Sequence, residues 1–355
     1  MSPEDRRIPV AVLGATGAVG QTFVRLLDGH PTFRVAELAA SERSAGKAYR
    51  EATHWLEGVM PADVAQLRVL PCEPGAVSSR AVFSALDSSV AGETEAAFAR
   101  AGAVVLSNAK NYRMEPDVPL VIPEINASHL GVLEAQRAAR GWSGAIVTNA
   151  NCAATVAALA LAPLQHAFGL KRVFVTTLQA VSGAGYPGVA SLDILGNVIP
   201  FIGGAEEEKI EAELPKLLGA FEGGALVDAS FAVSAQVNRV PVEHGHTVCM
   251  AVELERGTTA AEATEALDRW RGDAVCAGLP SAPERAVMVT GETNRPQPRR
   301  DVDAGRGMSV VVGRVRPDPI LHLRLVAMGH NTIRGAAGGS VLNAEVMSRM
   351  GLLGG

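Results

Sequence analysis

The sequence predicts an α/β fold, with an N-terminal Rossmann-like dinucleotide-binding domain and a second, α+β domain whose sheet is mostly antiparallel. In the first half of the chain, short β-branched runs alternate with helical segments, which is typical of a parallel, doubly wound sheet. A glycine-rich loop directly follows the first of these runs. In the second half, strand-like runs follow one another with few helices between them, which favours antiparallel pairing.

The composition is that of a globular protein large enough for two domains. The 355 residues are 48% hydrophobic and 19% charged, with a net charge of −5, so a general nucleic-acid or membrane surface is not expected. The N-terminal segment is polar and lacks the apolar core of a signal peptide. The four cysteines show neither metal-ligand spacing nor the density of a disulfide scaffold. We therefore expect a cytoplasmic protein without a metal site.

The first strand and the loop after it carry a dinucleotide-binding pattern. A buried-strand run, Val10 to Leu13, leads into Gly14-Ala15-Thr16-Gly17-Ala18-Val19-Gly20 and then into an amphipathic helix. Glycines allow the backbone to approach a pyrophosphate, whose charge lies against the helix N-terminus. A tight turn without a ligand is the alternative, but the strand–loop–helix order favours binding. The candidate contacts are Gly14, Thr16, Gly17, Ala18 and Val19.

The second strand, expected over Phe33 to Leu38, bears on the choice of cofactor. An NAD site tends to place an acidic residue near the end of this strand. Here the following loop offers Ser41, Arg43 and Ser44, donors that suit a 2′-phosphate. Glu37 and Glu42 leave NAD open, but the donors favour NADP.

Further strands are expected over Ala81 to Leu86 and Ala103 to Ser107, with a helix between them. Asn108, Lys110 and Arg113 follow the carboxyl end of the strand that ends at Ser107. Ligands bind at that edge of a parallel sheet.

The stretch around Cys152 lies where a strand meets a helix. Ile146 to Thr148 is β-branched, and Ala153 to Phe168 is strongly helical in composition. Asn149 and Asn151 favour a turn or a helix cap. The helix dipole and free N–H groups would favour a thiolate at Cys152 and hold an oxyanion on an attacked carbonyl. A buried, inert cysteine is the alternative, and this stretch alone does not decide between them.

The second half of the chain contributes five expected strands, a helix beginning at Glu206 and a C-terminal helix. The strands are expected over 172–180, 231–239, 247–254, 308–315 and 320–328.

Taken together, these features resemble the aspartate-β-semialdehyde dehydrogenases, in particular the archaeal and fungal branch. The resemblance runs from the glycine loop to the segment 331–338. Its most specific stretches are Ala40 to Lys47, Gln179 to Tyr186 and Arg239 to Thr247.

The resemblance implies a role for each matching residue. The nucleophile would be Cys152, with His246 as its acid/base partner and Gln179 positioning the acyl group. Arg239 would bind the substrate carboxylate. Arg113 and Lys209 would bind phosphate, with Glu206 orienting them, and Ser182, Gly183 and Asn331 would contact the cofactor. By composition alone His244 rivals His246, and Arg113, Glu206 and Lys209 could be ordinary surface charges.

The family's reaction is the NADP-dependent reduction of 4-phospho-L-aspartate to L-aspartate 4-semialdehyde through a thioester, with release of inorganic phosphate. It belongs to amino-acid biosynthesis. The resemblance further implies a homodimer or homotetramer. Residues 1–151, completed by 331–355, would bind NADP(H), and 152–330 would form the catalytic and dimerisation domain.

Three residues depart from the family pattern. Ala153 follows the cysteine where a hydroxyl residue is usual, Ala150 stands where proline is common, and Lys110 is an added cation. These departures bear on the acyl substrate more than on the reaction type. The alternatives are a reductase of a coenzyme A thioester such as malonyl-CoA, and a non-catalytic NADP-sensing protein.

Overall fold

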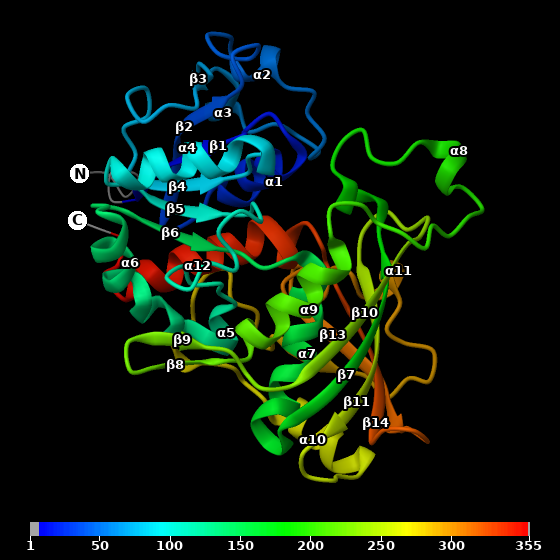
Figure 1. Cartoon of the computed structure of the whole chain (residues 1–355). Coiled ribbons are helices and arrows are strands. Elements are labelled where there is room, and N and C mark those ends of the chain that lie inside the picture. The colour runs from blue at the N-terminus through cyan, green and yellow to red at the C-terminus, as the bar shows by residue number, and fades with distance from the viewer. Residues whose placement is uncertain (1–6, 354–355) are drawn as a thin grey trace.

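The first half of the chain forms a six-stranded parallel sheet in the order β3-β2-β1-β4-β5-β6 (Figure 1). The structure is a computed structural model and describes residues 7–353. The strands are β1 (Ile8–Leu13), β2 (Phe33–Ala40), β3 (Leu70–Pro71), β4 (Ala81–Ser84), β5 (Val104–Ser107) and β6 (Ala145–Thr148). The prediction of a parallel, Rossmann-like sheet is confirmed.

Helices cover both faces of this sheet, because its central strands are apolar on both sides. On one face Val10 and Val12 pack with α1 (Ala18–Leu27) and with α12 (Gly338–Arg349). On the other face Ala11 and Leu13 pack in one cluster with α4 (Ser88–Arg100). The C-terminal helix α12, red in Figure 1, therefore returns to the first sheet.

The second sheet has the order β10-β7-β11-β14-β13-β12. Its strands are β7 (Leu170–Gln179), β10 (Ala232–Arg239), β11 (His246–Leu254), β12 (Val287–Val289), β13 (Val310–Pro317) and β14 (Leu323–Gly329). The central pairs are antiparallel, as predicted, but β10 pairs parallel with β7 and β12 parallel with β13. The sheet is thus mixed. The reason for the β7–β10 pair is the helical crossover between the two strands, which returns the chain in the same direction.

The helix α7 (Cys152–Phe168) is the centre of the second core. It is buried all round and packs among the inward residues of the second sheet. Helices α9 (Glu206–Leu217) and α10 (Ala260–Arg269) contribute to the same cluster. Since α7 follows β6, its N-terminus lies at the carboxyl edge of the first sheet, and its body lies in the second part of the molecule.

Most expected strands differ from the observed ones by one to three residues at an end. The strand expected from residue 320 begins at Leu323, because Asp318 accepts hydrogen bonds from the Ile320 and Leu321 N–H groups and closes a turn there. The strand expected to reach Leu86 ends at Ser84. Short helices complete the chain: α2 (Tyr49–Ala52), α3 (Ala62–Ala65), α5 (Pro123–Asn126), α6 (Leu133–Arg140), α8 (Ser191–Ile194) and α11 (Pro298–Asp301).

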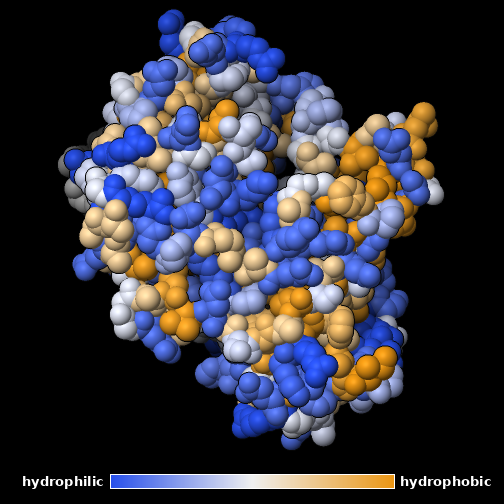
Figure 2. Space-filling view, viewed as in Figure 1, coloured by the Kyte–Doolittle hydropathy of each residue, from blue (hydrophilic) through white to orange (hydrophobic). Residues whose placement is uncertain are grey.

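Within residues 7–353, no helix is both long and apolar enough to cross a bilayer. An arm that includes α8 projects from the body of the molecule (Figure 1). Its side chains Leu192, Leu195 and Phe201 are exposed, and hydrophobic residues gather on this arm in Figure 2.

Candidate active site

Strand register brings three of the predicted site residues together at one end of the second sheet. Gln179 is paired with Arg239 across the parallel strands β7 and β10. On the other side of β7, β11 starts at His246, and its next residue pairs with Leu178. Gln179, Arg239 and His246 are all buried. Because successive side chains of a strand point to opposite faces, these three side chains share the inner face of the sheet, on the side of the N-terminus of α7.

Cys152, the first residue of α7, faces His246. The Sγ atom lies 3.1 Å from Nε2 of His246, and the Ala180 N–H donates to Nδ1 at 3.1 Å. With Nδ1 accepting, a neutral imidazole carries its hydrogen on Nε2, on the side of the sulfur. The carbonyl oxygen of Ala180 accepts a hydrogen bond from Nη1 of Arg239 at 2.8 Å, so the backbone of one residue orients both side chains.

His244, the rival by composition, lies elsewhere. Its Nδ1 is 3.0 Å from Oγ of Ser182, and its ring stacks on His330. The Ser182 hydroxyl also accepts from Nδ2 of Asn331 at 2.8 Å, and Oδ1 of Asn331 accepts from the Gly245 N–H. Ser182 and Asn331 thus form one network beside the site, and of the two histidines it is His246 that contacts the sulfur.

Asn151 connects the nucleophile to the acidic residue of α9. Its Oδ1 accepts from the N–H groups of Ala153 and Ala154, which caps α7, and its Nδ2 donates to Glu206 at 2.7 Å. Burial alone would raise the pKa of Glu206, but hydrogen bonding from Asn151 and the ammonium of Lys209, 3.1 Å away, hold it below its ordinary value. Asn151 was considered as a cap from sequence, but its link to Glu206 was not foreseen.

Arg113 is buried, although it follows β5 at the other side of the site. Nη1 donates to Glu213 at 2.8 Å and Nη2 donates to the carbonyl oxygen of Asn108 at 2.8 Å. Sequence reasoning missed Glu213. Its spacing of seven residues from Glu206 on one helix was the available signal, because such residues share a face.

Most of the predicted site residues line one cavity of about 580 Å³ between the two sheets, but the fully buried His246 and Glu213 are not among its lining residues. Its lining includes the predicted residues Val19, Arg113, Cys152, Gln179, Ser182, Gly183, Glu206, Lys209, Arg239 and Asn331. Lys110, the added cation, also lines it. In addition, Gly335 lies against the nucleophile, because a Cβ built on it would be 2.7 Å from Cβ of Cys152.

The glycine loop next to this cavity is built to accept a phosphate group. Gly14 has φ +69°, and a Cβ there would be 2.5 Å from the Ala85 carbonyl oxygen, so only glycine fits. Gly17 is the N-cap of α1 and leaves the helix end without a side-chain cap. The first-turn N–H groups at Ala18 and Val19 are therefore available to an anion. Thr16, within the loop, receives a hydrogen bond from Gln21 on its carbonyl oxygen.

The residues predicted to determine the specificity for NADP over NAD lie just after the end of β2. Ser41 and Arg43 are exposed and Ser44 is half-buried, in a turn closed by the Ser44 N–H donating to the Ser41 carbonyl oxygen. They lie at the same carboxyl edge of the sheet as the glycine loop, but they do not line the Cys152 cavity.

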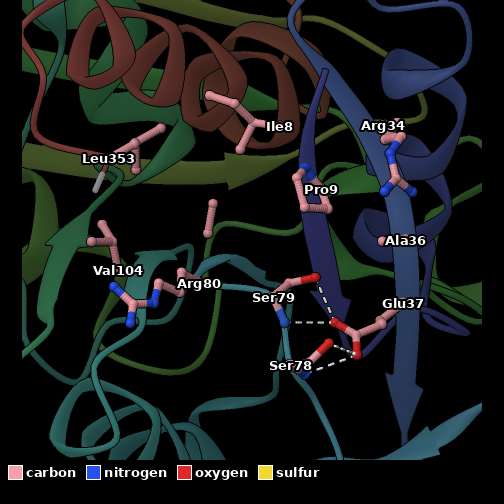
Figure 3. A pocket seen from close by; sticks show the side chains of 11 residues that line it. Ile8, Pro9, Arg34, Ala36, Glu37, Ser78, Ser79, Arg80, Val104 and Leu353 are labelled. Atoms are coloured by element: carbon pink, nitrogen blue, oxygen red, sulfur yellow. Dashed lines mark hydrogen bonds between the residues drawn. The ribbon is translucent and has the colours of Figure 1, made fainter. Parts of the chain in front are cut away.

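Glu37, which had left NAD open, points elsewhere. Its carboxylate accepts hydrogen bonds from the N–H and hydroxyl groups of both Ser78 and Ser79 (Figure 3). It lines a different pocket, together with Pro9 and Arg34 near the amino ends of the strands (Figure 3). Glu37 is therefore engaged by protein donors and is not free to bind a ribose.

The electrostatics of the cysteine differ from the sequence expectation. Burial, followed by the charge of Glu206, raises the pKa of Cys152 to about 12, against the lowering influence of Arg113 and Arg239. Burial, Arg239 and His330 lower the pKa of His246 to about 3. The helix N-terminus predicts a thiolate, and the Ala153 N–H does lower the pKa of Cys152, but burial outweighs it, and Asn151 also accepts from the Ala153 and Ala154 N–H groups. The pair is accordingly a neutral thiol and a neutral imidazole before a ligand binds.

Comparison with known proteins gives one consistent result. Residues 9–132 match the family model of the semialdehyde dehydrogenase NAD binding domain, and residues 161–334 match that of the semialdehyde dehydrogenase dimerisation domain. The chain is 51% identical to an aspartate-semialdehyde dehydrogenase of Methanothermobacter thermautotrophicus, over 97% of this chain and 99% of that protein. It is 46% identical to that of Schizosaccharomyces pombe, over 97% and 99%.

Solved structures agree. The structure of the aspartate-semialdehyde dehydrogenase of Candida albicans with NADP superposes with a TM-score of 0.89 at 40% identity, covering 98% of this chain and 99% of that one. That of enzyme II of Vibrio cholerae reaches a TM-score of 0.76 at 27% identity, over 97% and 98%. The archaeal and fungal relatives confirm the resemblance identified in the sequence.

Proposed function

The chain belongs to the aspartate-semialdehyde dehydrogenase family, and from that premise we propose that it reduces 4-phospho-L-aspartate to L-aspartate 4-semialdehyde with NADPH, reversibly. One observation carries this proposal: Cys152, whose Sγ lies 3.1 Å from Nε2 of His246, borders a cavity that is also lined by the cations Arg113, Lys209 and Arg239. A substrate with an anion at each end and a reactive carbonyl between them matches that distribution of charge.

The two anionic ends of the substrate would bind different cations. Arg239 is a planar, bidentate donor, which suits the α-carboxylate. Arg113 and Lys209 also line the cavity and would hold the phosphate. Glu206, bonded to Lys209, would fix that ammonium, and Gln179 would position the acyl group beside the sulfur.

In the biosynthetic direction Cys152 would attack the acyl carbon. The bond from that carbon to sulfur forms, the bond to the phosphate oxygen breaks, and inorganic phosphate leaves with that electron pair and with the proton of the Cys152 thiol. A thioester accepts hydride more readily than a carboxylate does, which is the advantage of the covalent intermediate.

His246 would donate a hydrogen bond from Nε2 to the carbonyl oxygen as negative charge develops there. When the carbonyl re-forms, the carbon–sulfur bond would break, the aldehyde would leave, and the sulfur would keep the electron pair and regain a proton from solvent. The Ala180 N–H supports this role, because it keeps the ring hydrogen on the nitrogen that faces Cys152. Burial lowers the pKa of His246 to about 3, so the ring would remain a neutral donor across the physiological pH range.

The glycine loop and the uncapped N-terminus of α1 fit a dinucleotide pyrophosphate, and Ser41, Arg43 and Ser44 offer donors to a 2′-phosphate. NADPH supplies the hydride when it is bound. Ser182, Gly183 and Asn331 would border the nicotinamide, since they line the Cys152 cavity. Glu37 does not oppose NADP, because its oxygens are already engaged.

The test is a substrate panel on the full chain. We expect phosphate-dependent reduction of NADP⁺ by aspartate semialdehyde, a lower rate with NAD⁺, and no turnover of malonyl-CoA with NADPH. Faster turnover of malonyl-CoA would favour the coenzyme A-dependent alternative. No turnover of any substrate, together with retained NADP⁺ binding, would favour the sensor.

We further propose that the chain forms a homodimer or homotetramer through the outer face of the second sheet. Helices α7, α9 and α10 cover the inner face. The outer face carries Phe174, 53% exposed, and Leu178, 36% exposed, beside the half-buried Cys249 and Val326. An exposed apolar sheet face of this kind indicates a protein contact.

We propose that residues 1–151 and 331–355 form the domain that binds the cofactor. Residues 152–330 form the domain that carries catalysis and subunit association. Residues 1–6, 354 and 355 of these ranges lie outside the described part of the chain. The cytoplasm is the proposed location, since the four cysteines are free.

A further inference from the structure

One face of α9 carries four charged residues. They are Glu206, Lys209, Glu213 and Lys216, spaced by three, four and three residues, so they form one stripe along the helix. Glu206 and Lys209 line the cavity, but Glu213 and Lys216 do not. Glu213 is 1% exposed and Lys216 is 3% exposed. Charges buried so deeply need specific partners.

The partners of Glu213 are a phosphate-binding candidate and the backbone next to the nucleophile. Oε1 accepts from Nη1 of Arg113 at 2.8 Å, and Oε2 accepts from the Asn151 N–H at 2.5 Å. One carboxylate therefore fixes Arg113 relative to Cys152. Two of the three guanidinium nitrogens of Arg113 are anchored in this way, by Glu213 and by the Asn108 carbonyl oxygen.

The third nitrogen, Nε of Arg113, is buried and has no hydrogen-bond partner among the described residues. An unpaired N–H on a buried guanidinium costs free energy unless an acceptor arrives. Because Arg113 borders the cavity, a phosphate oxygen is a suitable acceptor. Glu213 thus fixes the orientation in which the guanidinium of Arg113 borders the cavity.

Lys216 fixes the backbone that carries Arg113. Its Nζ donates to the carbonyl oxygens of Arg113, Glu115 and Val118 at 2.7, 2.7 and 2.9 Å. All three ammonium hydrogens are used, and the chain from 113 to 118 wraps around them. Side chain and backbone of Arg113 are therefore held by two residues one helical turn apart.

We propose that Glu213 is a positioning residue for phosphate, which acts through Arg113 without touching the substrate, with Lys216 holding the supporting backbone. The inference rests on the proposed function, since it assigns Arg113 to the phosphate of the acyl phosphate. It explains why α9 carries two deeply buried charges beyond those that line the cavity. The ligand class concerned is a phosphoryl or inorganic phosphate dianion.

The test is steady-state kinetics of Glu213→Gln in the direction that consumes phosphate, with NADP⁺ saturating. We expect the KM for phosphate to rise about tenfold or more, because a charge-assisted hydrogen bond that orients Arg113 is weakened. The KM for aspartate semialdehyde should change less than about twofold, because its carboxylate binds Arg239. Glu213→Asp, which keeps the charge at a shorter reach, should recover part of the phosphate affinity.

The matched control is Glu208→Gln, on the same helix. Glu208 is exposed and has no hydrogen bond or ion pair within residues 7–353, so both KM values should stay unchanged. Equal increases of both KM values in Glu213→Gln, or none, would overturn the inference. If this variant does not fold, as judged by thermal unfolding and NADP⁺ binding, the KM pattern of Glu213→Asp decides in the same way. An inactive wild type would instead contradict the proposed function.

Discussion

The thiol of Cys152 should be almost fully protonated in the ligand-free protein at neutral pH. Burial and the neighbouring carboxylate of Glu206 raise its pKa to about 12. The pKa of His246 falls to about 3, and its Nδ1 already accepts the Ala180 N–H, so a second ring proton would face another donor. A thiolate–imidazolium pair is therefore not expected.

The size of the effect follows from the pKa. An increase from 9.0 to about 12 lowers the thiolate fraction at pH 8 about a thousandfold, equivalent to about 4 kcal/mol. Below the pKa, the thiolate fraction rises tenfold with each unit of pH. The alkylation rate should therefore increase continuously from pH 6 to pH 10, without a plateau.

The assay is carbamidomethylation of the ligand-free protein by iodoacetamide, with modified Cys152 quantified by peptide mass spectrometry and glutathione as the reference thiol. Glu206→Gln should accelerate labelling, because it removes a negative charge that raises the thiol pKa. Arg239→Gln should slow it, because it removes a charge that lowers the pKa. The exposed Glu208→Gln is the control and should behave as wild type. A rate that levels off with an apparent pKa below 7 would refute this reasoning.

Three further predictions concern packing, substrate binding and assembly. Gly335→Ala places a methyl group within 2.7 Å of Cβ of Cys152, so it should cost about 1–3 kcal/mol of stability and lower kcat about a hundredfold. Gly291→Ala, which has open space around it, is the control and should change neither. Thermal unfolding measures the stability and steady-state turnover measures kcat. Arg239→Lys should raise the KM for aspartate semialdehyde about tenfold or more, since the bidentate fork is lost, and an unchanged KM would contradict its role. Replacing Phe174 and Leu178 together by Glu should halve the mass measured by light scattering or reduce it further; unchanged mass would place the interface elsewhere.

Much of the fold could be predicted because its signals are local. Residues adjacent in the sequence are enough to identify the strands, the glycine loop and the helix that begins at Cys152. The choice between His244 and His246 could not be made from composition. It depends on strand register, which places His246 beside Gln179 and leaves the earlier histidine next to Ser182.

The remainder depends on contacts between residues far apart in the chain. Glu213 meets Arg113 across 100 positions, and from sequence both resemble solvated charges. The thiolate expectation failed for a related reason. The helix N-terminus does lower the pKa of the thiol through the Ala153 N–H, but Asn151 shares these N–H groups as the cap, and burial has the larger effect. Glu37 likewise needed the structure, because its partners Ser78 and Ser79 are about forty residues away.

The central claim, a covalent acyl group on Cys152, is tested most directly by mixing the full chain with aspartate semialdehyde and NADP⁺ in the absence of phosphate. Hydride leaves the aldehyde carbon before phosphate is needed, so the account predicts a burst of one NADPH per active site and an aspartyl group on the Cys152 peptide. A burst that persists in Cys152→Ala, or an acyl group on a different residue, would contradict it.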